Sequence, residues 1–107
     1  MEYTGERNIK GEPNGQGTYT HPDGATHTGA FKDGKFHGYG TVTAASGSTY
    51  SGEWKDSLRN GQGTMTYGGN IIYNGEWKDG KRNGQGIYTH SHGWVLTGKW
   101  KDNKRVP

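Results

Sequence analysis

The chain has 107 residues, of which 21 are glycine and none is cysteine; 26% are hydrophobic and the formal net charge is +3. Only 11 residues are leucine, isoleucine, valine or phenylalanine, which excludes an ordinary two-layer aliphatic core. The aromatic fraction of 12% and the small net charge argue against disorder. The lack of cysteine excludes a disulfide framework and a thiolate zinc site.

A repeat of 23 residues explains this composition. The first unit carries one extra residue, because Gly5 precedes Gly29 by 24 positions, and we place it in the stretch 8–13. We predict one domain over residues 1–107, with units at about 3–26, 27–49, 50–72 and 73–95 and a partial unit at 96–107. The structural glycines of the repeat are Gly29, Gly38, Gly40, Gly52, Gly61, Gly63, Gly75, Gly84, Gly86 and Gly98.

Each unit contains two runs in which apolar and polar residues alternate, as in Tyr50–Lys55 and Gly61–Tyr67. This period of two indicates strands with one polar face. We predict nine antiparallel strands in a ribbon of roughly 40 Å, with no helix. The strands are expected at 2–8, 16–21, 25–31, 39–44, 48–55, 62–67, 71–78, 85–90 and 94–101.

Two kinds of turn join the predicted strands. Asp33-Gly34 and Asp79-Gly80 supply the positive φ angles that a hairpin requires, and Asn70 stands where other units have glycine in the second turn. Aromatic rings are expected to lie over the glycines of the neighbouring strand, where the missing side chain leaves room. Each unit therefore depends on its neighbours for stability.

The run Tyr73, Gly75, Trp77, Gly80, Gly84 and Gly86 resembles the MORN (membrane occupation and recognition nexus) repeat. The resemblance covers nearly the whole chain. It implies an all-β fold, namely an elongated, twisted single-layer antiparallel β-meander with aromatics along one groove. It also implies roles in scaffolding, attachment near membranes, binding of acidic phospholipids and service as an accessory module on enzymes.

Several positions depart from this pattern. Arg7 stands in place of tryptophan in the first unit, and His27 and Phe31 replace tyrosine and tryptophan in the second. Ser57 replaces a turn glycine, and Leu96 replaces tyrosine in the partial unit. We therefore expect the end units to be caps or degenerate copies.

Basic residues recur at one end of every hairpin and form what we call the basic edge. Such a row is suited to phosphates or an anionic membrane surface. The alternative is a solvated edge that prevents aggregation. The basic edge consists of Lys32, Lys35, Lys55, Arg59, Lys78, Lys81, Arg82, Lys101, Lys104 and Arg105.

The rings of the repeat form a second candidate surface, the aromatic groove. It is suited to an apolar helix, a peptide or a sugar face. The same rings are also the only core this composition allows, and both roles are compatible in a single-layer sheet. The aromatic groove consists of Tyr50, Trp54, Tyr67, Tyr73, Trp77, Tyr88 and Trp100.

No catalytic residue, metal site or cofactor is predicted. Glu53 and Glu76 are one repeat apart on the predicted polar face, which lacks the apolar surroundings of a catalytic carboxyl pair. His21, His90 and His92 lack an acidic or thiolate partner and are expected at surface turns. The glycines form no phosphate-binding loop.

These observations predict a non-catalytic scaffold or adaptor that binds a protein partner along the aromatic groove. Attachment to acidic phospholipid through the basic edge and glycan binding are the alternatives. We expect no specific nucleic-acid binding, because rings and cations occupy different parts of each strand. With Arg7 and Lys99 on the end strands, we expect a monomer or a weak end-to-end dimer. No apolar run is long enough for a membrane span, so the cytoplasm is the expected compartment, with peripheral membrane attachment as the alternative.

Overall fold

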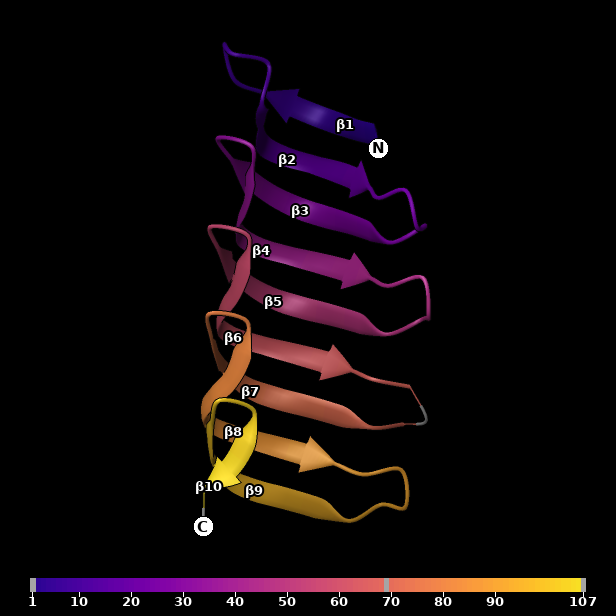
Figure 1. Ribbon diagram of the computed structural model, residues 1–107, viewed down its shortest axis with the longest axis vertical. Helices are drawn as coiled ribbons and strands as arrows, with labels where there is room; N and C mark the ends of the chain where they lie inside the picture. The colour runs from indigo at the N-terminus through magenta and orange to yellow at the C-terminus, as the bar shows by residue number, and fades with distance from the viewer. Residues whose placement is uncertain (1, 69, 107) are drawn as a thin grey trace.

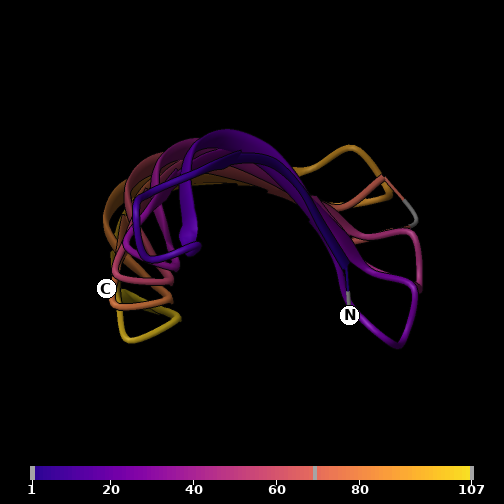
Figure 2. The same ribbon diagram turned by 90° about the horizontal axis from the view of Figure 1, so that it is seen from above.

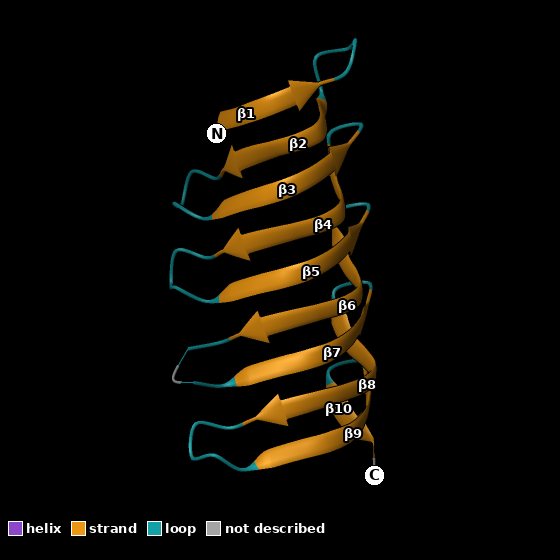
Figure 3. Cartoon of the chain, turned by 180° about the vertical axis from the view of Figure 1, so that it is seen from behind, coloured by secondary structure: helices purple, strands orange, loops and turns teal. Residues whose placement is uncertain are grey.

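The computed structural model describes residues 2–68 and 70–106 and contains one antiparallel sheet with its strands in chain order (Figure 1). The molecule measures 48 × 24 × 16 Å, and strands and turns account for the whole view from behind (Figure 3). This confirms the predicted all-β meander. The strands are β1 Glu2–Arg7, β2 Pro13–Thr20, β3 Thr26–Lys32, β4 Lys35–Thr43, β5 Thr49–Lys55, β6 Leu58–Thr66, β7 Ile72–Lys78, β8 Lys81–Thr89, β9 Val95–Lys101 and β10 Lys104–Val106.

Bulges bend the sheet into an arch, which Figure 2 shows from above. Between the pairs Gly52↔Gly63 and Trp54↔Arg59, the single residue Glu53 lies opposite residues 60–62. Gly61 within this bulge has a φ of 100°, a conformation that favours glycine. The same irregularity recurs in the hairpins β1–β2, β3–β4 and β7–β8. The arch gives the sheet a concave face and a convex face.

The repeated glutamate stabilises the bulge from the convex face. Glu53 Oε2 accepts a hydrogen bond of 2.6 Å from the backbone N–H of Gln62, and Glu76 Oε1 accepts one of 2.6 Å from Gln85. A bulge leaves a backbone donor without a ladder partner, and these carboxylates supply the acceptor. The glutamates therefore have a structural task that the alternating pattern did not reveal.

Four two-residue turns close the hairpins at the end of the strands that carries the basic edge. At the tip of β7 and β8, Asp79 has a φ of 51° and Gly80 a φ of 84°, as the predicted hairpin turn requires. Ser57 keeps the left-handed conformation with a φ of 69°, although the glycine is missing. At the opposite edge, Asn70 has a φ of 65°, which confirms its predicted conformation.

The boundaries of the return strands differ from the prediction. β4, β6 and β8 begin at Lys35, Leu58 and Lys81, four residues before the expected starts at 39, 62 and 85. The prediction started each return strand next to its bulge glycine, such as Gly61 in β6. In the structure, the pairing between strands continues on both sides of that glycine. β10 was also missed. The extra residue of the first unit does lie in the loop after β1, where Asn8 Oδ1 accepts hydrogen bonds from the backbone N–H groups of Lys10 and Glu12.

The core lies on the concave face and consists of rings that cover glycines, as predicted. A Cβ atom added to Gly63 would lie 2.5 Å from Cε1 of Tyr50, and one added to Gly86 would lie 2.5 Å from the same atom of Tyr73. Tyr50 is 2% exposed and Tyr73 is fully buried. The buried side chains of this face are His27, Phe31, Tyr50, Tyr73, Trp77 and Trp100.

A second line of hydrogen bonds connects the units at the hairpin tips, which curl over in Figures 1 and 2. The backbone N–H of Gly80 donates to the carbonyl of Arg59 over 2.9 Å, and that of Asn103 donates to the carbonyl of Arg82 over 3.0 Å. Equivalent bonds of 2.9 Å join Gly34 and Ser57 to the hairpins before them. Each unit is therefore held to its predecessor at two separate places.

Candidate functional site

The concave face contains all seven rings of the aromatic groove, but they lie at different depths. Tyr50, Tyr73, Trp77 and Trp100 are buried, whereas Trp54, Tyr67 and Tyr88 are half-buried. Met65 and Leu96 also pack on the buried rings from above. The first four rings form the floor of the groove, and the accessible surface consists of the other three with their two aliphatic neighbours.

Three rings of the floor form a ladder of edge-to-face contacts, namely Tyr50, Trp77 and Tyr73, whereas Trp100 lies tilted against Tyr73 at 32°. Tyr50 packs against Trp77 with ring centroids 5.4 Å apart and planes at 89°, and Tyr73 packs against Trp77 at 5.2 Å and 87°. The Trp77 indole N–H donates to the Gly63 carbonyl over 3.1 Å. The Tyr73 hydroxyl donates to the Glu76 carbonyl over 3.0 Å. Because the polar atoms of these three rings have partners and their planes interlock, this part of the floor is rigid.

Burial raises the pKa of Tyr50 and of Tyr73 to about 12. Both phenols therefore stay neutral at physiological pH.

Two arginines of the basic edge lie on the concave face instead of in an exposed turn. Arg59 is the cross-strand partner of Trp54, and Arg82 that of Trp77. The guanidinium carbon of Arg59 lies 4.7 Å above the Trp77 ring, and its Nη2 donates to the Gly80 carbonyl over 2.8 Å. Arg82 lies 5.7 Å from the ring of Tyr73. Both side chains are half-buried, and burial lowers the pKa of Arg59.

The lysines of the basic edge are exposed at the hairpin tips. Three pairs face each other directly across a turn, namely Lys32↔Lys35, Lys78↔Lys81 and Lys101↔Lys104. In the remaining hairpin Lys55 faces Leu58. Like charges placed opposite one another destabilise a hairpin slightly. These pairs therefore concentrate positive charge at the tips at a small cost in stability.

The second unit closes one end of the groove with an apolar cluster around a histidine. His27 is fully buried and stacks on Phe36 with centroids 3.6 Å apart and planes at 4°. Trp54 packs against it at 4.9 Å. Neither ring nitrogen has a hydrogen-bond partner in the described part of the chain. Burial, with a smaller contribution from His21, lowers the pKa of His27 to about 4.

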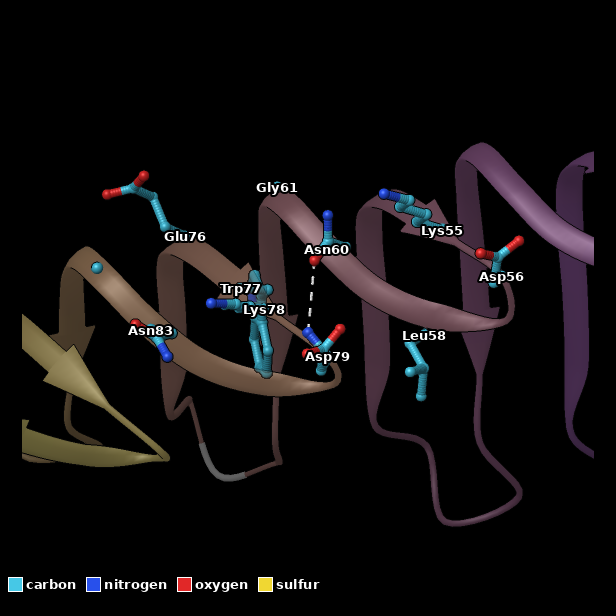
Figure 4. Close-up of a pocket in the computed structure, with 11 residues that line it drawn as sticks. Lys55, Asp56, Leu58, Asn60, Gly61, Glu76, Trp77, Lys78, Asp79 and Asn83 are labelled. Carbon is cyan, nitrogen blue, oxygen red and sulfur yellow. Dashed lines mark hydrogen bonds between the residues drawn. The ribbon is translucent and has the colours of Figure 1, made fainter.

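A shallow groove of about 740 Å³ separates two successive hairpins near their tips (Figure 4). It is lined by residues of both charges, such as Lys55 and Lys78 beside Asp56 and Asp79. The backbone N–H of Asp79 donates across the groove to Asn60 Oδ1 over 3.4 Å. The lining therefore gives this groove no charge of a single sign that would favour one class of ligand.

The residues considered for catalysis or metal binding make other contacts in the structure. Glu53 and Glu76 bind backbone amides, as described above. His90 stacks on Trp94 at 4.4 Å and on His92 at 5.4 Å in the turn after β8. Over residues 2–68 and 70–106, no three His, Cys, Asp or Glu residues gather as metal ligands. That same part of the chain has no helix able to span a membrane.

An open β-meander of hairpin units, held together by a ladder of rings over glycines, defines a repeat protein of the single-sheet class. The family model of the MORN repeat matches residues 9–26, 27–49, 50–70 and 73–94. The chain therefore belongs to the MORN repeat family, which comprises non-enzymatic modules generally associated with proteins or membranes. A search of curated proteins finds no match.

Proposed function

We propose that this protein is a scaffold module that binds a protein partner along the aromatic groove. The supporting observation is the set of half-buried apolar side chains on a rigid concave floor. Trp54, Tyr67 and Tyr88 keep part of each ring accessible, and buried rings hold them from beneath. Aromatic side chains fixed before binding lose little conformational entropy, which favours their use in interfaces.

Site-specific photo-crosslinking tests this proposal, because neighbouring residues of β8 project to opposite faces. A photoreactive phenylalanine analogue at Tyr88 lies in the groove, and the same group at Ile87 lies on the convex face, where Ile87 is 48% exposed. In source-cell extract we expect a discrete adduct from position 88 and none from position 87. Mass spectrometry of the adduct identifies the partner. Adducts from position 87 alone, or from neither position, would contradict a groove interface.

Attachment to an anionic membrane surface is a second candidate, which the opposed lysine pairs favour. We expect Lys35→Gln/Lys81→Gln to weaken binding to phosphatidylserine vesicles about 30-fold, because each basic residue near such a surface contributes about 1 kcal/mol. Arg82 is left intact in this variant because its half-buried guanidinium stabilises the ring ladder. Vesicle sedimentation at low salt measures the effect.

The control for this experiment is Ala45→Glu/Ser91→Glu, which lowers the net charge by the same amount at the opposite edge of the sheet. Both positions are exposed in turns. If binding depends on the lysine pairs, this control binds vesicles better than the glutamine variant does. Equal losses would show only a response to net charge, and failure of the unmodified protein to sediment would exclude the membrane candidate.

A further inference from the structure

A small notch opens on the concave face beside the last complete hairpin. Its volume is about 190 Å³, enough for one side chain. We call it the terminal notch, and it is lined by Arg82, Tyr88, Leu96, Trp100, Asn103 and Arg105. The lining combines apolar walls with two guanidinium groups and contains no acidic residue.

The notch exists because Leu96 stands where the preceding unit has Tyr73. The Tyr73 ring covers Gly86 and packs edge-to-face on Trp77 at 5.2 Å. Leu96 lacks the ring that packs on Trp77, and it cannot reach Gly98 as the Tyr73 hydroxyl reaches Gly75, where an added Cβ atom would lie 2.8 Å from that oxygen. A Cβ atom added to Gly98 would instead have Arg105 as its nearest neighbour, with Nε at 3.5 Å. The missing ring thus leaves space that an arginine borders.

A buried donor beside the notch also lacks an acceptor among the described residues. The indoles of Trp54 and Trp77 each donate to a glycine carbonyl, at 3.2 and 3.1 Å. Trp100 is 5% exposed, yet its Nε1 has no partner among the described residues. Its plane lies at 32° to that of Tyr73, compared with 89° for the pair Tyr50 and Trp77. Because a buried donor without an acceptor is costly, an acceptor entering the notch would be favoured.

The guanidinium groups provide the charge for that acceptor. Arg82 uses Nη2 to bind the Asn103 carbonyl over 2.7 Å, and Arg105 uses Nε and Nη2 to bind the Thr97 carbonyl. Within the described residues, Nε of Arg82 is buried and unpaired. Arginine matches the planar geometry of a carboxylate, and a positive notch favours an anion over a neutral amide.

We propose that the terminal notch binds the side-chain carboxylate of a glutamate or aspartate in a partner segment lying along the aromatic groove. The carboxylate faces Arg82 and Arg105, and its methylene groups contact Leu96 and Tyr88. The Trp100 ring turns as the side chain enters, so that its Nε1 gains an acceptor. This inference rests on the proposed scaffold function and names the chemistry of the partner.

Titration with two matched peptides tests the proposal. The probes are acetyl-Ala-Leu-Glu-Leu-Ala-amide and its glutamine counterpart, which carry no terminal charge. We expect the glutamate peptide to bind about tenfold more tightly, as for a charge-assisted hydrogen bond. The indole N–H signal of Trp100 in a ¹⁵N NMR spectrum, assigned with Trp100→Phe, should shift on binding.

Two variants and one control locate the effect. Arg105→Gln should remove the preference for the glutamate peptide, and Leu96→Tyr should remove it by filling the notch with the ring found in other units. Lys104→Gln makes the same change in charge at the neighbouring position of β10 but is not part of the lining. It should keep the preference. Equal losses in Arg105→Gln and Lys104→Gln would overturn the site.

The remaining outcomes separate this inference from the scaffold proposal. Equal binding of both peptides without a shift of Trp100 overturns the notch and leaves the groove function intact. A shift of Trp100 with inorganic phosphate but with neither peptide overturns the assignment to carboxylates. Preference for the glutamate peptide together with no crosslink from position 88 retains the notch and overturns the groove interface. Binding of none of these probes overturns the inference.

Discussion

Gly63→Ala is expected to lower the free energy of unfolding by about 3 kcal/mol, because the added methyl group overpacks the core of rings on the concave face. The new Cβ would lie 2.5 Å from Cε1 of Tyr50. That ring cannot withdraw, since Tyr50 is 2% exposed and packs against Trp54 and Trp77. Urea unfolding followed by tryptophan fluorescence measures the change.

Gly47→Ala serves as the control for this variant. A Cβ atom at Gly47 meets nothing within 4 Å, although its φ of 99° makes alanine unfavourable there. We expect a loss of about 1 kcal/mol from backbone strain alone. Equal losses in the two variants would mean that contact between ring and glycine does not determine stability.

Acidification is expected to destabilise the protein through His27. Burial lowers the pKa of His27 from 6.5 to about 4 in the folded state. Above pH 6.5 the ring is neutral in both states, so it contributes no pH dependence. As pH falls from 6.5 to 4, the unfolded chain takes up a proton that the folded one excludes. Stability therefore declines across this window, by about 3 kcal/mol in total.

His27→Tyr separates this effect from carboxylate titration at the lower end of the window. Tyrosine occupies the equivalent position in neighbouring units and remains uncharged at these pH values. We expect the difference in unfolding free energy between the two proteins to grow as pH falls from 7 to 4. Parallel pH profiles would show that His27 is already protonated in the folded protein or is solvated.

The glycine spacing made the fold predictable. A period of 23 residues fixes the two antiparallel strands of each unit, and the alternation of rings with polar residues fixes the face of the sheet to which each side chain points. Asn70 shows the same logic at a turn, since only a few residues other than glycine accept a φ of 65°. The placement of Tyr50 over Gly63 was also predictable from the sequence, because a single-layer sheet can bury its rings only over the glycines of a neighbouring strand.

The candidate site was less predictable, because the basic residues were grouped by charge and not by the strand face on which alternation places them. Arg59 and Arg82 are the second residues of β6 and β8, one position after the residue that leaves the turn, and so they lie on the opposite face from an exposed lysine such as Lys81. The structure pairs them with Trp54 and Trp77 across the strands, which brings both guanidinium groups onto the ring floor. The terminal notch could not be predicted from the sequence either. Leu96 was identified as a departure from the pattern, but the space left by its missing ring depends on the tilt of Trp100.

The hydrogen bonds between hairpin tips form a second row along the arch, parallel to the hydrogen bonds of the sheet and offset from them. Two such rows resist flattening and twisting of the arch better than one, since either deformation must stretch hydrogen bonds in both rows. The curvature of the concave face is therefore set before any encounter. A partner that binds there has to follow this backbone curve, even where a single ring such as Trp100 turns to admit one of its side chains. Affinity will then depend on how well a segment fits that curve along several units in succession.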